Sequence, residues 1–468
     1  MTTPDQFDLR LPPPPATIHM VGIGGIGMSG LARMLARSGY RITGSDVLDS
    51  PLLAELRAEG IAAYTGHAAE QLGTPALVIT TRAAIRPDNP ELLAAQERGI
   101  PIVKRGAVLG LLCNERVCVA VAGTHGKSTT CGMLALALER AGEAPSFAVG
   151  AVVRQLGSNA RLGAGPIFVA EADEFDYSFL WLSPDVAVIN SIEPDHPDIF
   201  PTFEAVEEAF DRFAQRIRPG GTLVISADDP GCRALVSRRP WPEGTDIVTF
   251  GLSEHADWRI ERVAGRDHFH GPQGTVRLRL AVPGIHNRRN AAAALAAGAA
   301  LGIAPARLAA GLEEFTGVGR RFERRGEAGG VTVIDDYAHH PTEIRVNIVA
   351  ARERYPAARV VALFQPHTFS RTRQLLDEFA QALSLADEVV LAPIYAAREQ
   401  DDLGVSSADI AARVAGPCVA LADSVEEAGR LGAELARPGD VLLVLGAGDI
   451  PRAGEIALQL LEQSTKGS

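Results

Sequence analysis

Lysine is nearly absent from this chain: among its 45 Lys and Arg residues, only Lys104, Lys127 and Lys466 are lysines. The formal net charge is −12, and no run of basic residues occurs. An acidic chain of this kind argues against a general nucleic-acid-binding protein, although a local site can still bind a small anion. Because arginine carries almost all the positive charge, a lysine inside a glycine-rich turn is a candidate for a specific role.

Cysteine and long apolar runs are also scarce. The five cysteines are scattered, their count is odd and no C-x-x-C occurs, which excludes a disulfide framework and a cysteine metal site and predicts a reducing, cytoplasmic location. No apolar run reaches about 18 uncharged residues, so no membrane span is expected. The start, "MTTPDQFDLRLPPPP", lacks the features of a signal peptide and predicts a disordered lead over residues 1–15.

Strand-like apolar runs alternate with alanine-rich helical stretches, which is typical of parallel α/β structure. With 468 residues the chain is too long for one compact core. New strand–turn–helix units begin at "TIHMVGIGG", "RVCVAVAGTHGKSTT" and "GVTVIDDYAHHPTEI", and the glycine-rich, charged stretch 315–330 predicts a linker before the last of them. We therefore expect three α/β domains, at residues 16–112, 113–316 and 317–468.

The first glycine turn fits a nucleotide diphosphate. Gly22, Gly24 and Gly27 follow G-x-G-x-x-G after a predicted strand, and the acidic Asp46 comes about 20 residues after the last glycine. This pattern is typical of dinucleotide-binding turns and so favours a dehydrogenase. However, a helix N-terminus binds a diphosphate whatever base it carries, so another nucleotide fits equally well.

The second glycine turn, "AGTHGKST" at residues 122–129, resembles a phosphate-binding loop. Val121 stands where the strict G-x-x-x-x-G-K-[ST] pattern needs glycine, and Gly123 comes two residues later. In such a loop Lys127 contacts the outer phosphates and Ser128 binds Mg²⁺. The alternative is a surface lysine in a glycine turn, which the scarcity of lysine disfavours; a dehydrogenase would not need this loop.

Carboxylates, histidines and asparagines follow later strands. Glu171 comes directly after a predicted strand and suits Mg²⁺, since parallel sheets collect functional groups at the carboxyl ends of their strands. His196 could bind a second metal or serve as a structural hydrogen-bonding group. Asn287 and Asn290 begin a helical stretch, where one could cap the helix and the other could contact a ligand.

Six motifs in this order resemble the Mur ligase family of peptidoglycan (cell wall) synthesis: "GTHGKST", "EADEFD", "NSIEPDH", "GIHNRRN", "GRRFE" and "DDYAHHPTE". The resemblance covers residues 16 to about 455. It implies a Rossmann-like domain for a UDP-sugar, a central P-loop-type ATP-binding domain and a Rossmann-like C-terminal domain for an amino acid. "GIGGIGMSGLA" and "FQPHTFSRT" favour the member that joins L-alanine to UDP-N-acetylmuramate; the alternative is the member that recycles a murein tripeptide.

The resemblance also implies roles for individual residues. The implied catalytic residues are Lys127, Glu171, His196 and Arg321. The implied metal ligands are Ser128, Glu171 and His196. The implied ATP-binding residues are Gly123, Thr124, His125, Gly126, Lys127, Ser128, Thr129, Asn287, Asn290, Arg321 and Asp336. The implied UDP-sugar residues are Gly24, Gly25, Ile26, Ser29, Asp46 and His67. The implied amino-acid pocket consists of Tyr337, His339, His367 and Arg371.

The activity that the resemblance implies is an ATP-dependent amide ligation with two Mg²⁺, or Mn²⁺ in their place. The lactyl carboxylate would attack the γ-phosphate, giving an acyl phosphate and ADP, and the amine of L-alanine would then displace phosphate. His339 or a nearby carboxylate would accept the amine proton. No nucleic-acid partner is expected, and the protein would be a monomer or homodimer. On the residues alone, a dehydrogenase and a nucleotide-sensing binding module remain alternatives.

The sequence departs from the family pattern in three ways. Phe175 stands where serine is expected, and "ITTRAAI" brings Arg82 into a stretch of small residues on the sugar-nucleotide side. No lysine lies between Lys127 and Lys466, so we do not expect the carbamylated lysine that several family members use beside the metal.

Overall fold

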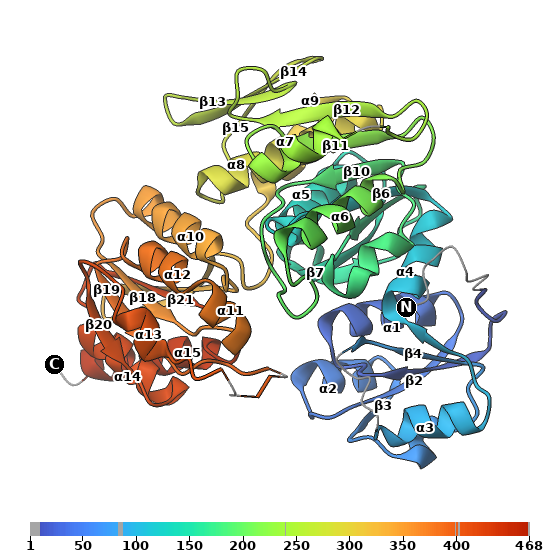
Figure 1. Cartoon of the computed structure of the whole chain (residues 1–468), viewed down its shortest axis with the longest axis horizontal. Helices are drawn as coiled ribbons and strands as arrows, with labels where there is room; N and C mark the ends of the chain where they lie inside the picture. The colour runs from blue at the N-terminus through green and yellow to red at the C-terminus, as the bar shows by residue number, and fades with distance from the viewer. Residues whose placement is uncertain (1–9, 83–87, 239, 398, 401–402, 467–468) are drawn as a thin grey trace. The chain divides into compact units, whose positions relative to one another are not determined.

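The computed structural model describes residues 10–82, 88–238, 240–397, 399–400 and 403–466 (Figure 1). Residues 1–9 of the expected disordered lead lie outside the described residues. Contacts divide the chain into two compact units, the first made of residues 1–193, 203–279 and 290–315 and the second of residues 194–202, 280–289 and 316–468. Within the described residues, no helix is both long and apolar enough to cross a bilayer.

The first unit begins with a five-stranded parallel sheet of order β3-β2-β1-β4-β5. Its strands are β1 (Thr17–Val21), β2 (Arg41–Asp46), β3 (Ala62–Thr65), β4 (Leu77–Thr80) and β5 (Ile102–Lys104). The connecting helices are α1 (Ile26–Arg37), α2 (Pro51–Ala58), the 3-10 turn η2 (Ala69–Leu72), α3 (Pro90–Glu97) and α4 (Arg105–Asn114). The chain runs outward in both directions from β1, so a crevice is expected at the carboxyl ends of β1 and β4.

A ten-stranded sheet follows in the same unit, with the order β15-β14-β13-β12-β11-β10-β6-β9-β7-β8. Its strands are β6 (Val117–Ala122), β7 (Ser146–Val153), β8 (Ser158–Arg161), β9 (Ile167–Glu171), β10 (Val186–Ile189), β11 (Thr222–Ser226), β12 (Asp246–Gly251), β13 (Trp258–Val263), β14 (Arg266–Gly271) and β15 (Gly274–Leu278). The helices of this part of the chain are α5 (Lys127–Arg140), η4 (Arg154–Leu156), η5 (Phe175–Trp181), α6 (Phe203–Ala214), α7 (Pro230–Ser237), α8 (Ile285–Ala300) and α9 (Pro305–Glu314).

The central strands of this sheet are parallel, as the sequence predicts. The antiparallel pairs β13–β14, β14–β15 and β7–β8 at its two edges were not predicted. Strand β6 lies between β9 and β10, and each of these neighbours is parallel to it. The turns that leave β6, β9 and β10 therefore meet at one edge of the sheet, and this edge carries the second glycine turn.

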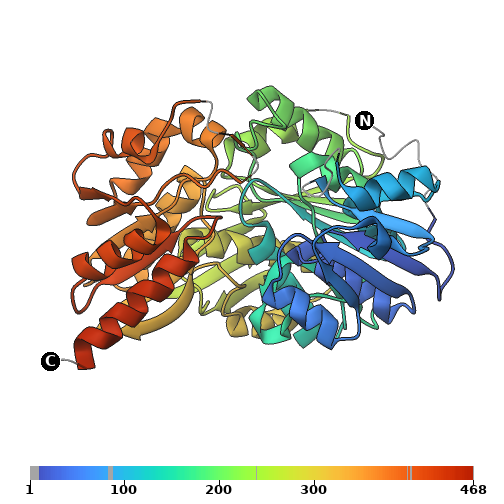
Figure 2. The same cartoon turned by 90° about the horizontal axis from the view of Figure 1, so that it is seen from below.

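The second unit contains a six-stranded sheet of order β16-β17-β21-β18-β19-β20. Its strands are β16 (Glu323–Ala328), β17 (Val331–Asp336), β18 (Val360–Phe364), β19 (Glu388–Leu391), β20 (Cys418–Leu421) and β21 (Val441–Leu445). Its helices are α10 (Pro341–Arg354), α11 (Phe369–Gln374), α12 (Leu376–Leu383), α13 (Ser407–Ala411), α14 (Val425–Leu435) and α15 (Pro451–Lys466). Helices cover both faces of this sheet (Figures 1 and 2).

The linker predicted at residues 315–330 is wrong over much of its length, because Glu323–Ala328 forms the edge strand β16, antiparallel to β17. Its charged residues suit an edge that is half in contact with water, and Gly326 leaves room for Leu458 of α15. A glycine-rich, charged composition therefore cannot be used to distinguish an edge strand from a linker.

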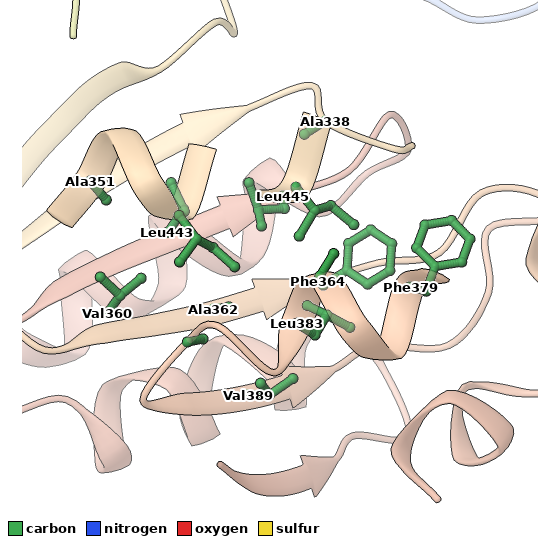
Figure 3. Close-up of a cluster of buried hydrophobic side chains, with 14 of the residues drawn as sticks. Ala338, Ala351, Val360, Ala362, Phe364, Phe379, Leu383, Val389, Leu443 and Leu445 are labelled. Carbon is green, nitrogen blue, oxygen red and sulfur yellow. The ribbon is translucent and has the colours of Figure 1, made fainter. Parts of the chain in front are cut away.

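The core of the second unit is built from the alternation of side chains along buried strands. Val360, Ala362 and Phe364 of β18 face one side together with Leu443 and Leu445 of β21 (Figure 3). Helices α10 and α12 pack on that side, and α14 and α15 cover the opposite side. Burying apolar surface stabilises the folded chain by about 25 cal/mol per Å². Because both faces of the sheet are buried in this way, its strands form a stable support for the loops at their ends.

Candidate active site

The second glycine turn joins β6 to α5 in a conformation that needs glycine. Gly123 has φ 131° and Gly126 has φ 79°, which are backbone angles that other residues rarely adopt. The segment after β10 holds the turn in place: Thr124 N donates to Ser191 O at 2.9 Å, and His125 N donates to Ser191 Oγ at 3.1 Å. The predicted strand–turn–helix is therefore present, with the backbone at the N-terminus of a 14-residue helix.

Lys127 is the first residue of α5, and its ammonium group is surrounded by acceptors. Its Nζ lies 2.7 and 2.9 Å from the two carboxylate oxygens of Glu174 and 2.8 Å from Gly123 O. Burial opposes the charge, but the carboxylates of Glu174 and Asp173 outweigh it and raise the pKa of Lys127. Glu174 belongs to the "EADEFD" motif but has no role among the site residues predicted from the sequence.

Ser128 and Glu171 form a pair of oxygen ligands beside this turn. Ser128 Oγ donates to Glu171 Oε1 at 3.0 Å, and Gly150 N donates to Glu171 Oε2 at 2.6 Å. A hydroxyl and a carboxylate are the ligand types that Mg²⁺ prefers, and it usually keeps several waters besides them. Ser128 and Glu171, the two predicted metal ligands that belong to the first unit, therefore lie together and are of the type that binds Mg²⁺.

Three further predicted ATP residues lie in helices α5 and α8. Thr129 is buried in the first turn of α5. Asn290, in α8, lies so close to Gly126 that a Cβ added to that glycine would be 2.5 Å from Asn290 Oδ1. Asn287, in the first turn of α8, donates from Nδ2 to Pro283 O at 2.6 Å. The structure thus places Asn290 at the phosphate turn, and it gives Asn287 a local backbone contact.

The first glycine turn borders a cavity of about 400 Å³ in the first unit. Gly24 N donates to Asp46 Oδ2 at 2.9 Å, so the turn and the end of β2 are joined. Among the predicted sugar-nucleotide residues, the cavity is lined by Gly25, Ile26, Asp46 and His67. Gly24 and Ser29 do not line it: Ser29 is buried and donates to Ile26 O at 3.0 Å.

One cation that lines this cavity is not among the site residues predicted from the sequence. Arg105 lines it at the start of α4, and a Cβ added to Gly27 would lie 3.0 Å from an Arg105 guanidinium nitrogen. A guanidinium beside a helix N-terminus suits a diphosphate. Arg105 follows β5 directly, and functional groups gather at the carboxyl ends of parallel strands, so this position in the sequence could have predicted its role. The same cavity reaches Glu171 and Asp173, so it extends to the metal-type carboxylates of the second sheet.

In the second unit, Arg321 and Asp336 lie at the carboxyl end of β17. Asp336 accepts from Phe322 N at 2.6 Å and from Ala338 N at 2.8 Å. Burial raises the pKa of Asp336 to about 6, against the opposing charge of Arg321. Arg321 donates to Glu343 at 3.2 Å and lies 5.3 Å from the centre of the Tyr337 ring.

The predicted amino-acid residues lie together in the second unit. The rings of Tyr337 and His339 are 5.4 Å apart, and those of His339 and His367 are 5.9 Å apart. Burial lowers the pKa of His339 to about 3, so its imidazole is neutral at pH 7. Arg371 donates to Asp195 Oδ1 from Nε at 2.9 Å and from Nη2 at 2.6 Å. Asp195 belongs to the "NSIEPDH" motif but is not among the site residues predicted from the sequence.

His196 is also in the second unit, whereas Glu171 is in the first. Its backbone has φ 52°, and His196 N donates to Asp195 Oδ1 at 2.7 Å. Its Nε2 lies 3.7 Å from Asp195 Oδ2. The structure therefore gives His196 a carboxylate neighbour, and its role as a metal ligand stays a prediction.

The two unexplained departures from the family pattern meet in the first unit. The guanidinium of Arg82 lies 5.7 Å from the centre of the Phe175 ring. Arg82 also donates to Asp176 at 3.4 Å, and Lys104 donates to the same carboxylate at 2.7 Å. Phe175 and Arg82 thus form a cation–π pair next to an ion-paired aspartate.

The second glycine turn, with its charge-paired lysine, and the first glycine turn, beside its cavity, are arrangements typical of nucleotide-binding enzymes. Three family models match the chain: "Mur ligase family, catalytic domain" at residues 17–116, "Mur ligase middle domain" at 121–298 and "Mur ligase, glutamate ligase domain" at 320–448. The chain belongs to the Mur ligase family, and its α/β fold with three sheet-bearing domains is the architecture of that family.

Relatives with curated names give more detail. The chain is 46% identical over 464 residues to the UDP-N-acetylmuramate–L-alanine ligase of Mycolicibacterium gilvum, covering 96% of this chain and 97% of that one. It is 44% identical over 458 residues to the enzyme of the same name from Salinibacter ruber, covering 95% of each chain.

Solved structures agree on the fold. The UDP-N-acetylmuramate-alanine ligase MurC of Thermotoga maritima matches with a TM-score of 0.79 and 30% identity, over 97% of this chain and 100% of that one. A murein peptide ligase from Psychrobacter arcticus matches with a TM-score of 0.74 over 96% of this chain and 99% of that one. Its identity is 24%, so this second likeness concerns the fold alone.

Proposed function

We propose that this protein joins L-alanine to the lactyl carboxylate of UDP-N-acetylmuramate and converts ATP to ADP and phosphate. The observation that carries the proposal is the phosphate turn, in which Lys127 begins α5 beside Ser128 and Glu171. The names and full-length similarity of the curated relatives supply the substrates. The cavity beside the first glycine turn, which also reaches Glu171 and Asp173, supports a sugar-nucleotide site there.

In the first step, the lactyl carboxylate attacks the γ-phosphate of ATP to give an acyl phosphate and ADP. Phosphoryl transfer needs chiefly positioning and neutralisation of charge. The backbone of residues 123–126 and the N-terminus of α5 bind phosphate oxygens, and Lys127 contributes a fixed positive charge. Arg321 contributes a second cation, the role that the family resemblance gives it.

Mg²⁺ belongs to this proposal because Ser128 and Glu171 present a hydroxyl and a carboxylate 3.0 Å apart. The ion would supply neutralisation of phosphate charge. His196 stays the predicted ligand of a second ion, and Mn²⁺, which accepts the same oxygen ligands, can replace Mg²⁺. No lysine lies between Lys127 and Lys466, so this proposal includes no carbamylated lysine as a further ligand.

In the second step, the amine of L-alanine attacks the acyl carbon and phosphate leaves. Tyr337, His339, His367 and Arg371 would line the amino-acid pocket. The imidazole of His339 is neutral and can accept a proton, but a pKa of about 3 makes it a weak base at pH 7. A nearby carboxylate is the alternative acceptor. The predicted cytoplasmic location and the monomeric or homodimeric state complete the proposal.

The test is phosphate release from ATP and Mg²⁺ in the presence of UDP-N-acetylmuramate, with L-alanine, L-serine, glycine or murein tripeptide added separately. Release that needs the UDP-sugar, is fastest with L-alanine and is lost in Lys127→Ala would support the proposal. Release with tripeptide alone would assign the chain to murein-tripeptide recycling. A folded protein that binds ATP but releases no phosphate with any acceptor would be a nucleotide-sensing module, and saturable NADH binding would revive the dehydrogenase hypothesis.

A further inference from the structure

A buried carboxylate lies behind the sugar-nucleotide cavity. Glu91 is in the first turn of α3, and its side chain is 0% exposed. Its Oε2 accepts a hydrogen bond from the Ser45 hydroxyl and lies 3.2 Å from His67 Nδ1. His67 lines the cavity, whereas Glu91 does not. The carboxylate therefore acts on the cavity through His67.

The surroundings of Glu91 favour its ionised form. The other carboxylate oxygen, Oε1, lies 3.7 Å from His19 Nε2. With the Gln71 amide oriented so that both its oxygen and its nitrogen have partners, the nitrogen donates to Glu91 Oε1 at 2.9 Å. The position at the N-terminus of α3 also favours a negative charge. Burial opposes ionisation, but His19, Ser45 and His67 outweigh it and lower the pKa of Glu91.

Hydrogen counting then fixes the proton of His67. Ser45 Oγ lies 2.8 Å from His67 Nδ1, and a serine hydroxyl has a single hydrogen. That hydrogen goes to Glu91, because an ionised carboxylate can only accept. His67 Nδ1 must therefore be the donor to Ser45 and Glu91. In the neutral imidazole, Nε2 is then left with a lone pair, and among the described residues no hydrogen bond reaches it.

We propose that Glu91 is a positioning residue for sugar-nucleotide binding, because through Ser45 it keeps the proton of His67 on Nδ1 and so makes Nε2 a hydrogen-bond acceptor facing the nucleotide. The group that Nε2 accepts from is a donor of the nucleotide, either a ribose hydroxyl or the imide N–H of the base. The inference rests on the proposed function, since it takes the cavity to be the UDP-sugar site.

Replacing Glu91 by Gln should reverse the direction of the hydrogen bonds that join residue 91, Ser45 and His67. The side-chain amide nitrogen of Gln71 donates to Oε1, so the oxygen of the introduced amide faces Gln71 and its NH₂ group faces Ser45. Ser45 then accepts from the amide and donates its hydrogen to His67 Nδ1. The proton of His67 moves to Nε2, which becomes a donor where an acceptor is needed.

The experiment is ¹⁵N nuclear magnetic resonance of the full chain labelled at histidine, with the His67 signals assigned by His67→Gln. In the wild type we expect the proton of His67 on Nδ1, and in Glu91→Gln on Nε2. Glu97→Gln is the matched control, since it makes the same change at the exposed end of α3 and should leave the pattern unchanged. A wild-type proton on Nε2, or the same pattern in Glu91→Gln, would overturn the inference.

Binding of UDP, measured by calorimetry, gives the functional readout. We expect Glu91→Gln to bind UDP about tenfold more weakly, which is the effect of losing one hydrogen bond, and Glu97→Gln to bind like the wild type. If 2′,3′-dideoxy-UDP removes the difference, the donor is a ribose hydroxyl; if the difference persists, it is the imide. Equal UDP affinity in wild type and Glu91→Gln would refute the positioning role. Failure of the wild type itself to bind UDP would instead refute the proposed sugar-nucleotide site, while the proton position of His67 can still be measured.

Discussion

Lys127 Nζ lies 2.7 Å from Glu174 Oε2 at the first turn of α5. The pair is buried, with side-chain exposures of 13% for Lys127 and 3% for Glu174. Breaking a buried ion pair on one side leaves an uncompensated charge. Glu174 thus balances the charge of Lys127 and fixes the position of its ammonium group beside the phosphate turn.

We expect Lys127→Ala to lower kcat for phosphate release by about 10²–10³-fold, because it removes a fixed charge from the phosphates. Glu174→Gln should lower kcat by about tenfold, because the lysine stays but loses a charge-assisted hydrogen bond that positions it. Steady-state kinetics with saturating substrates measure both effects. Lys104→Ala, which removes a lysine paired with Asp176, is the control and should change kcat less than threefold; an equal loss there would contradict a specific role for Lys127.

Ser128→Ala and Glu171→Gln should each raise the Mg²⁺ concentration needed for half-maximal activity by at least about tenfold, because each removes an oxygen ligand. A titration of activity with Mg²⁺ at fixed ATP measures this, and paramagnetic resonance of Mn²⁺ gives a readout that does not depend on turnover. Glu139→Gln, at the other end of α5, should leave the metal dependence unchanged. Unaltered Mg²⁺ dependence in both site variants would show that the metal is held elsewhere.

Gly126→Ala should lower the free energy of unfolding by roughly 2–4 kcal/mol. A positive φ costs about 1–2 kcal/mol for a residue with a Cβ, and here that Cβ would also lie 2.5 Å from Asn290 Oδ1. Gly142→Ala is the matched control, because its φ of 82° is like the 79° of Gly126 but its Cβ would meet nothing within 4 Å. Chemical denaturation measures both variants, and equal losses would mean that the contact with Asn290 contributes nothing.

Phe175→Ser should lower the free energy of unfolding only slightly, and the size of this effect should depend on whether Arg82 is present. A cation–π contact at a partly exposed site contributes about 0.5–1 kcal/mol. A double-mutant cycle of Phe175→Ser with Arg82→Ala, followed by thermal unfolding, should therefore give a coupling free energy of that size. Strictly additive effects would show that the two departures from the family pattern are independent.

Asp336 should make the protein less stable as the pH rises. Its pKa of about 6 in the folded state exceeds the ordinary value of 3.8, so the folded state binds more protons between these limits. The stabilising contribution is complete below pH 3.8 and is lost as the pH rises through 6. Melting temperatures of wild type and Asp336→Asn, measured from pH 4 to 7, should show the wild type losing stability relative to the variant. Parallel curves would contradict the raised pKa.

The sequence by itself determined the family, the α/β fold and the positions of both glycine turns. Strand–turn–helix patterns are local, and the spacing of Gly123, Gly126 and Lys127 requires only neighbouring residues to be read. The same holds for the carboxylate of Glu171 at the end of a buried strand. The edge strand β16 was not predicted because its charged, glycine-rich composition is also typical of a linker, although its partner β17 follows directly in the chain.

Only the tertiary structure decided which partners the functional groups have. Glu174 pairs with Lys127 across 47 positions of the chain, Asp195 with Arg371 across 176 and Glu91 with His67 across 24. No periodicity or motif spacing reports such contacts, because they depend on how parallel strands are ordered in a sheet. Such partners raise the pKa of Lys127 and lower the pKa of Glu91 against the effect of burial, whereas burial itself raises the pKa of Asp336.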